Sequence, residues 1–327
     1  MAWRSALRYA VPCCIFVAER RGTMRLAVLY GILAALIWAG QPVVSKFGYH
    51  AGLTAVDQTF LRYATSGLLL LPYVVRRCGR DAFGLGWGRA AVLMLAAGPL
   101  YSLVLIGGVA WAPAAHSSLI YPALTPIFGA LLMKWLVGRS EHIPLPGLAL
   151  LVGGVVIVGF ANVLGHNTQS LPHAWRGDVL FVLAALIWAV YLLLVRRWKA
   201  DPFAVVGIVQ MSAVIYVAPY LALKGFAVFH TDWRQLILQA LYLGVGVSIG
   251  AVTLINLAVR ELGAKASMFT ALVPPFGVGL AVFLLGEPAT PLVMLGTAAI
   301  GAGLAWSLIA KVRGIAPSVA SASTSPE

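Results

Sequence analysis

The 327-residue chain is 61% hydrophobic and only 10% charged, which excludes a soluble globular fold because such proteins carry roughly 25% charged residues. Its formal net charge of +13 does not indicate nucleic-acid binding, because the basic residues form short clusters between apolar blocks and not one basic face or tail. The blocks are continuously apolar and about 20 residues long. We therefore expect an all-α integral membrane protein in a lipid bilayer, and not a closed barrel.

Residues 1–25 are interpreted as an N-terminal extension. Its short apolar run, YAVPCCIFVA, contains Pro12 and is followed at once by ERRG. This pattern resembles a weak signal peptide, but the proline and the charges favour an extension, with Met24 as an alternative start. The chain has three cysteines, of which two are adjacent and one lies in a basic loop, so we expect no disulfide framework, no metal and no cofactor; they are Cys13, Cys14 and Cys78.

Ten membrane-spanning helices are predicted in chain order, most of them joined by short connections. Residues 26–165 hold the first five spans and residues 177–310 hold the other five, while residues 311–327 form a small polar tail that we expect to be disordered. The predicted spans are 26–45, 55–75, 90–110, 114–136, 143–163, 178–195, 203–223, 235–257, 264–285 and 290–310.

The distribution of basic residues predicts the orientation of these helices. An N-terminus in the cytoplasm puts 18 of the 23 Lys and Arg residues on cytoplasmic segments. Of the five exceptions, Arg62 lies within a span. The other four lie on the outer side of the membrane: Lys46, Arg176, Lys224 and Arg234. Cytoplasmic loops carry such an excess of basic residues. We therefore predict a multi-pass protein of the inner or plasma membrane with both termini in the cytoplasm.

An internal repeat divides the chain in two. The string LAALIWA occurs at 33–39 and again at 183–189, an offset of 150. Three further pairs recur at an offset of 149, which indicates duplication: Pro126 with Pro275, Gly147 with Gly296, and Gly154 with Gly303. Each copy has five helices, so the second copy enters the membrane from the opposite side. Inverted repeats of this kind are typical of secondary transporters.

The repeated segments also carry a resemblance. LAALIWA opens each half, FLRYATSGLLLLP lies in the second span, and AKASMFTALVPPFGVGLAVFLLGEP covers the ninth. Over residues 26–310 the chain resembles the EamA family of the drug/metabolite transporter superfamily. The resemblance implies ten helices, cytoplasmic termini, a cavity between the halves and often the export of amino acids or other metabolites. The first half departs from the pattern, because Arg139 stands where an acid is expected, with Glu141 as a substitute.

Prolines recur at matching places in the fourth and ninth spans. A proline has no N–H and disrupts the hydrogen bond to the carbonyl four residues earlier, so both helices are expected to be interrupted. Interrupted helices in matching positions mark binding sites and moving elements of transporters, whereas the alternative is a pair of structural kinks. The gating candidates are Pro122, Pro126, Pro274 and Pro275.

Arg62 is the only charged residue well inside a predicted span. Its burial costs at least about 2.5–3.5 kcal/mol on insertion scales, so it should face the interior or water. Arg62 either binds a carboxylate or phosphate, or serves as a structural anchor or gate, and we favour the second role. The neutral Gln210 stands at the equivalent place in the second half.

Aromatic and neutral polar residues complete the predicted substrate path. Trp38 and Trp188 are repeat-equivalent and lie away from the span ends, so they either stack on a substrate or pack between helices. At the end of the ninth span, Glu287 is expected to cap a neighbouring helix or pair with a basic residue. The other candidates are Gln41, Tyr101, Tyr121, Tyr191, Ser248 and Asn256.

These patterns predict a secondary transporter, and not an enzyme, that moves a small-molecule substrate by alternating access. An amino acid or similar amphipathic solute is expected, with export as the direction and a monomer or homodimer as the assembly. No Asp or Glu lies in the middle of a span, which weakens proton coupling, and no Walker loop supports ATP drive. The alternatives are a lipid-type flippase, which needs a laterally open basic groove, and a membrane-embedded transferase, which needs clustered acids or histidines.

Overall fold

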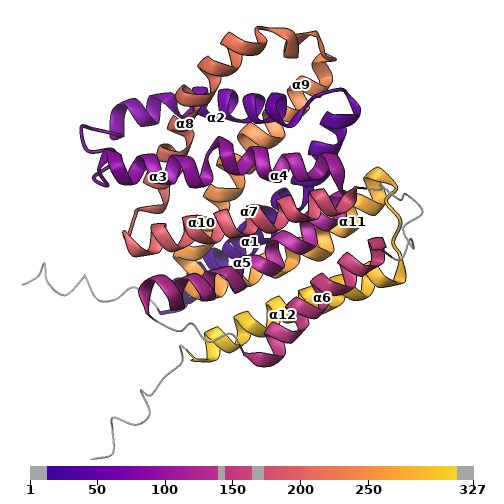
Figure 1. Ribbon diagram of the computed structural model, residues 1–327. Coiled ribbons are helices and arrows are strands. Elements are labelled where there is room, and N and C mark those ends of the chain that lie inside the picture. The colour runs from indigo at the N-terminus through magenta and orange to yellow at the C-terminus, as the bar shows by residue number, and fades with distance from the viewer. Residues whose placement is uncertain (1–12, 139–143, 164–172, 315–327) are drawn as a thin grey trace, which may run out of the picture.

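The computed structural model describes residues 13–138, 144–163 and 173–314, and every regular element within them is a helix (Figure 1). Eight of these helices are long and apolar enough to cross a membrane. Two further spans are less typical: α2 (Ala55–Arg77) carries Asp57 and Arg62, and the apolar stretch of α6 (Leu145–Val163) ends at Phe160. The predicted ten-helix membrane fold is confirmed.

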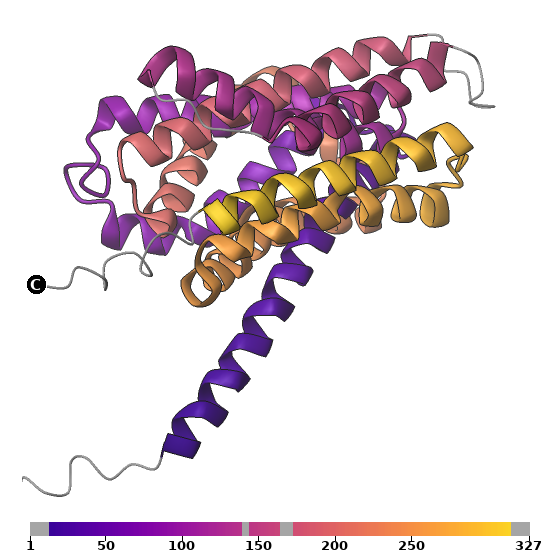
Figure 2. The same cartoon turned by 90° about the horizontal axis from the view of Figure 1, so that it is seen from below.

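The first half comprises α1 (Cys13–His50), α2, the pair α3 (Trp87–Ala97) and α4 (Pro99–Trp111), α5 (Ala114–Val137) and α6. The third span changes from α3 to α4 at Gly98 and Pro99. α1 is longer than predicted, because it begins at Cys13 inside the expected extension, and its N-terminal part projects from the bundle (Figure 2). The chain has no proline between Cys13 and Pro42, so nothing of that kind interrupts the helix.

The second half comprises α7 (Ala174–Arg197), α8 (Pro202–Lys224), η2 (Ala227–His230), α9 (Trp233–Gln239), η3 (Ala240–Ala251), α10 (Val252–Leu262), η4 (Gly263–Leu272), α11 (Val273–Leu285) and α12 (Pro291–Gly314). One span is formed by α9, η3 and α10, and its η3 segment is π-helical. The 3-10 helix η4 leads directly into α11. Departures from α-helical geometry inside a span often mark a functional region.

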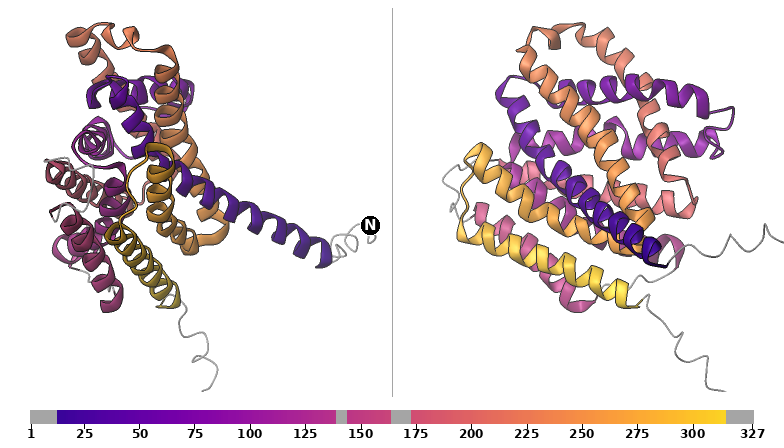
Figure 3. Two further views of the ribbon diagram at one scale, coloured as in Figure 1. Left: turned by 90° about the vertical axis from the view of Figure 1, so that its right-hand side faces the viewer. Right: turned by 180° about the vertical axis from the view of Figure 1, so that it is seen from behind.

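The first helix of each half packs against helices of the other half. α1 packs against α10 and α11, and its counterpart α7 packs against α4 and α5. The second spans α2 and α8 contact each other, as do the last spans α6 and α12, which lie side by side in Figures 1 and 3. Because each half contributes five spans, equivalent helices run in opposite directions, as an inverted repeat requires.

The crossing of α6 and α12 depends on the repeated glycines. A Cβ atom added to Gly154 would lie 2.6 Å from Ile300 Cγ1 and 3.0 Å from the carbonyl oxygen of Gly296. A Cβ atom on Gly303 would lie 3.1 Å from the carbonyl oxygen of Gly147. The glycines that reveal the duplication therefore allow the two helices to approach closely, as small residues do between membrane helices.

The two ends of the bundle differ in charge and in their contacts. The basic end holds the α2–α3 and α7–α8 connections, and arginine pairs end both α2 and α7 there. The opposite end holds the α1–α2, α4–α5 and α11–α12 connections. We call it the tied end, because polar contacts between the halves join its helices.

Candidate functional site

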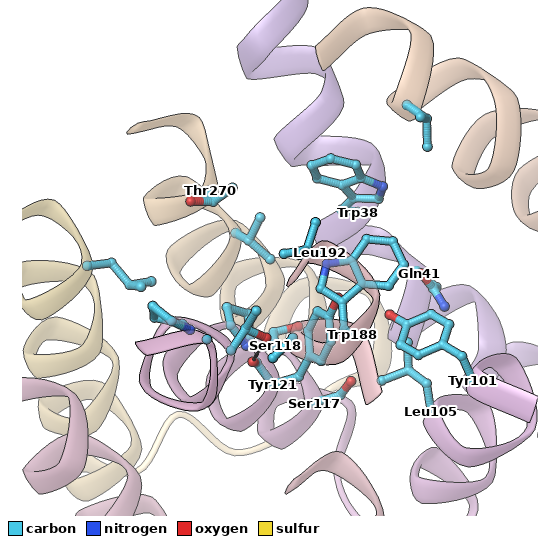
Figure 4. Close-up of a pocket in the computed structure, with 18 of the residues that line it drawn as sticks. Trp38, Gln41, Tyr101, Leu105, Ser117, Ser118, Tyr121, Trp188, Leu192 and Thr270 are labelled. Atoms are coloured by element: carbon cyan, nitrogen blue, oxygen red, sulfur yellow. Dashed lines mark hydrogen bonds between the residues drawn. The ribbon is translucent and has the colours of Figure 1, made fainter. Parts of the chain in front are cut away.

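A cavity of about 550 Å³ lies between the two halves. Its wall includes residues of α1, α2, α4, α5, α7, η3 and η4. Figure 4 labels lining residues from α1, α4, α5, α7 and η4. The cavity extends from Arg62 and Leu105, in the middle of the bundle, to Pro144 and Arg196 at the basic end. Arg196 is exposed, so the cavity reaches the surface there. None of its lining residues belongs to the described connections of the tied end.

The cavity gathers many of the residues singled out from the sequence. Eight of them line it: Trp38, Gln41, Arg62, Tyr101, Tyr121, Pro122, Pro126 and Trp188. Six do not: Tyr191, Gln210, Ser248, Asn256, Pro274 and Pro275. Gln210 accepts a hydrogen bond from Ser66 where α8 meets α2. Tyr191 packs against the Trp188 ring, with 4.7 Å between the ring centroids.

Aromatic rings form one wall of the cavity. Trp38 and Trp188 project into the same space from α1 and α7 (Figure 4). The Trp188 ring lies 5.0 Å from the Tyr101 ring, and the Tyr101 ring lies 6.1 Å from that of Tyr121, measured between centroids. These side chains present broad apolar faces together with a few polar groups. The wall therefore suits a solute with an apolar or aromatic part.

Two side chains at the inner part of the cavity have donors without a partner among the described residues. Arg62 is 8% exposed, and its Nε donates to Ser248 Oγ at 2.8 Å, which joins α2 to the π-helical η3. Its Nη1 is buried without a hydrogen-bond partner among the described residues. Gln41 is 7% exposed, and its Nε2 likewise has no partner there. Both groups can only donate, so each has capacity for an acceptor on a bound solute.

Several lining residues were not predicted from the sequence. They include Ser117, Ser118, Thr125, Leu192, Arg196 and Thr270. One of them could have been found from the repeat, because Thr270 follows the candidate Tyr121 by 149 residues, the offset of the proline pair. Both of these residues line the cavity.

The fourth and ninth spans differ at their prolines. α5 stays one α-helix through Pro122 and Pro126, both of which line the cavity. The hydroxyl of Thr125, between them, donates to a backbone carbonyl one turn earlier. In contrast, Pro274 and Pro275 lie in the first turn of α11, directly after η4. A proline in a first turn removes no helical hydrogen bond, so the ninth span changes helix type there.

Opposite charges hold the α4–α5 turn at the tied end. Lys46 Nζ donates to the Val109 carbonyl, near the C-terminus of α4, at 3.0 Å. Glu287 accepts from the N–H groups of Ala114 at 2.6 Å and Ala115 at 3.0 Å, at the N-terminus of α5. A cation at a helix C-terminus and an anion at an N-terminus are both favourable. The predicted capping by Glu287 is confirmed.

A histidine–aspartate contact and an ion pair between the halves complete the tied end. His116 Nδ1 on α5 lies 2.8 Å from Asp178 Oδ1 on α7. Asp57 Oδ1 on α2 lies 3.2 Å from Lys224 Nζ on α8, and it accepts a hydrogen bond of 2.7 Å from the Tyr220 hydroxyl. Polar contacts from both halves therefore close this end, whereas the cavity reaches the other.

Some predictions fall outside the described residues. They concern the substitution of an acid by Arg139, the compensating Glu141, the first 12 residues of the extension, and the tail from residue 315 onward.

Comparisons with known proteins agree with this architecture. The model of the EamA-like transporter family matches residues 25–170 and 175–309. An uncharacterized transporter of Archaeoglobus fulgidus is 25% identical over 261 residues, 78% of this chain and 88% of the relative. An uncharacterized protein of Pseudomonas aeruginosa is 28% identical over 304 residues, which cover 87% of this chain and 95% of the relative. A protein of known crystal structure shares the fold, with a TM-score of 0.60 and 20% sequence identity. The match covers 89% of this chain and 98% of the chain in that structure.

Proposed function

Because the chain belongs to the EamA-like transporter family, we propose that it is a secondary transporter that exports a small amphipathic metabolite, such as an amino acid, by alternating access. The observation that carries the proposal is the cavity between the halves, which reaches the basic end and is separated from the tied end by polar contacts. A central site between inverted repeats, open to one side at a time, is what alternating access requires.

The charge distribution supports an orientation for this proposal. Arginine pairs end α2 and α7 at the basic end, whereas isolated basic residues such as Lys46 and Lys224 lie toward the tied end. By the positive-inside rule, we infer that the basic end lies in the cytoplasm and that the protein is in the plasma membrane. α1 begins and α12 ends at that side. A cavity open to the cytoplasm is the state in which an exporter loads its substrate.

We infer that the solute passes through chemically unchanged. The described residues that line the cavity include serine, threonine and tyrosine hydroxyls but no Asp, Glu, His, Lys or Cys. They therefore offer no acid and base pair for a group-transfer reaction. This composition supports a carrier over a membrane-embedded transferase.

Transport by purified protein in sealed proteoliposomes tests the proposal. Vesicles loaded with a metabolite mixture should lose one class of solute faster than protein-free vesicles, as measured by mass spectrometry of the retained contents. Preloading with the transported solute should also accelerate uptake of its labelled form, since a carrier exchanges substrate across the membrane. Equal retention of every solute in the two vesicle populations would reject the carrier function.

A further inference from the structure

The inner part of the cavity carries a positive charge that its described lining does not balance. Arg62 uses Nε for Ser248, while its buried Nη1 has no hydrogen-bond partner among the residues that the structure describes. Among the described lining residues there is no Asp or Glu, and the other charged one, Arg196, is also basic. A buried cation is unfavourable unless acceptors or an anion surround it. The cavity therefore favours a ligand that brings a negative group.

Gln41 adds a second donor from another helix. Its Nε2 is buried, lines the same cavity as Arg62 and has no partner in the part of the chain that the structure describes. An unpaired buried donor gains free energy when an acceptor reaches it. Two such donors, one charged and both on side chains that are more than nine-tenths buried, favour oxygen atoms of a ligand as their acceptors.

The rest of the wall selects the body of the ligand. Trp38, Tyr101 and Trp188 present ring faces, and the remaining lining side chains are mostly apolar or carry neutral hydroxyls. Pockets of this composition bind ligands with an apolar body, and a few polar groups fix their orientation. The volume of about 550 Å³ lies within the range of small-molecule sites, roughly 300–1,000 Å³.

We propose that this cavity binds an organic carboxylate with an apolar or aromatic body. The carboxylate accepts from the guanidinium of Arg62 and the side-chain amide of Gln41, and the body lies against Trp38 and Trp188. This inference rests on the proposed transport function and names its substrate class. A carboxylate matches one guanidinium and one amide, whereas a phosphate is commonly held by clustered basic groups or a helix N-terminus. The ligand needs no ammonium group, because no described acid lines the cavity.

Four probes that share a phenyl ring separate the possible ligand charges. They are 3-phenylpropionate, its uncharged amide, phenethylamine and phenyl phosphate. Binding to the full chain in nanodiscs is measured by isothermal titration calorimetry at one ionic strength. We expect 3-phenylpropionate to bind about tenfold or more tightly than the amide, as a charge-assisted hydrogen bond predicts. Stronger binding of the amine, the amide or the phosphate would overturn the carboxylate assignment.

Substitutions link the selectivity to the two donors. Arg62→Gln should weaken 3-phenylpropionate binding by about tenfold or more, while binding of the amide stays within about twofold. Gln41→Glu places an acid in the cavity and should favour phenethylamine over 3-phenylpropionate. Arg89→Gln removes an exposed arginine outside the cavity, which lies against the Trp198 ring, and should leave every affinity unchanged. Melting temperatures confirm that each variant is folded, so a lost preference is not mistaken for unfolding.

Transport distinguishes failure of this inference from failure of the proposed function. If 3-phenylpropionate exchanges across proteoliposomes and Arg62→Gln abolishes the exchange, both ideas are supported. If no carboxylate binds or exchanges while another solute from the metabolite mixture does, the carboxylate inference fails and the carrier remains. If no solute is exchanged at all, the carrier function itself fails, and the inference falls with it.

Discussion

The tied end and the basic end of this bundle are built from equivalent helices but are held in different ways. At the tied end, Glu287 of the second half caps α5 of the first, and His116 of the first half pairs with Asp178 of the second. At the basic end the cavity passes between the halves to the exposed Arg196. The described contacts between the halves therefore differ at the two ends, because caps and paired side chains join the halves at the tied end while the cavity reaches the surface at the basic end.

This difference shows how one end could open without disrupting the apolar core. A polar contact can be replaced by hydrogen bonds to water, so its net contribution is about 0.5–1.5 kcal/mol, or about 1.5–3 kcal/mol for a charged group. Separation of apolar faces costs in proportion to the area exposed. An end that is closed by a helix cap and by paired polar side chains is therefore suited to a reversible gate, whereas the α6–α12 crossing, with its closely approaching glycines, is suited to stay fixed.

The largest effect should come from a change that affects both ends alike. Gly154→Leu inserts a side chain where a Cβ already lies 2.6 Å from Ile300 Cγ1, and overpacking of this kind costs about 1–3 kcal/mol or more. We expect a lower melting temperature and less monodisperse protein in size-exclusion chromatography. The matched control is Gly153→Leu, since a Cβ on Gly153 meets no atom within 4 Å. Equal losses in the two variants would mean that the crossing does not set the stability.

Glu287→Gln should reduce the difference between the two ends, because it weakens the contacts that close the tied end. It removes the anion that accepts from Ala114 and Ala115 N–H, and a lost charged hydrogen bond of about 1.5–3 kcal/mol would shift the gate toward opening by about tenfold or more. Ser117→Cys, in a chain whose three native cysteines are replaced by serine, reports this shift because Ser117 lines the cavity and is 2% exposed. A membrane-impermeant thiol reagent added from the tied-end side should label it faster in Glu287→Gln.

Glu261→Gln is the control for that measurement. Glu261 is an exposed acid near the basic end of α10, so its neutralisation changes the net charge equally but touches no contact at the tied end. Labelling from the tied-end side should stay at its original rate in this variant. If both glutamine variants accelerated labelling, net charge and not the helix cap would control the gate.

Most of the fold was predictable, because the apolar blocks indicate the number of helices and the repeat indicates two inverted halves, without any knowledge of contacts. The matched tryptophans Trp38 and Trp188 line the cavity together, and the matched glycines mark the α6–α12 crossing. The capping by Glu287 was also predictable, since a carboxylate at a helix end in a membrane needs donors. In each case a feature that is visible in the sequence, a repeated residue or a carboxylate at a helix end, indicates which kind of contact the residue makes.

The site was less predictable, because helix rotation decides which polar residues face the cavity. Tyr191 and Gln210 were expected on the path, yet one packs behind Trp188 and the other bonds to Ser66. The π-helical η3 changes the residue spacing of the eighth span and brings Ser248 to Arg62. Hydrophobic content alone does not report such a change in helix type.

The smallest effect should come from Lys224→Gln, also at the tied end. Lys224 is 40% exposed and pairs with Asp57 at 3.2 Å, and exposed pairs contribute about 0–1 kcal/mol. Asp57 keeps its hydrogen bonds to Thr54 and Tyr220, so the melting temperature should change by less than about 3 °C and labelling of Ser117→Cys should rise less than in Glu287→Gln. Equal labelling in these two variants would locate the gate in the peripheral α2–α8 pair. A strong difference would locate it in the buried contacts around the α4–α5 turn, next to the cavity.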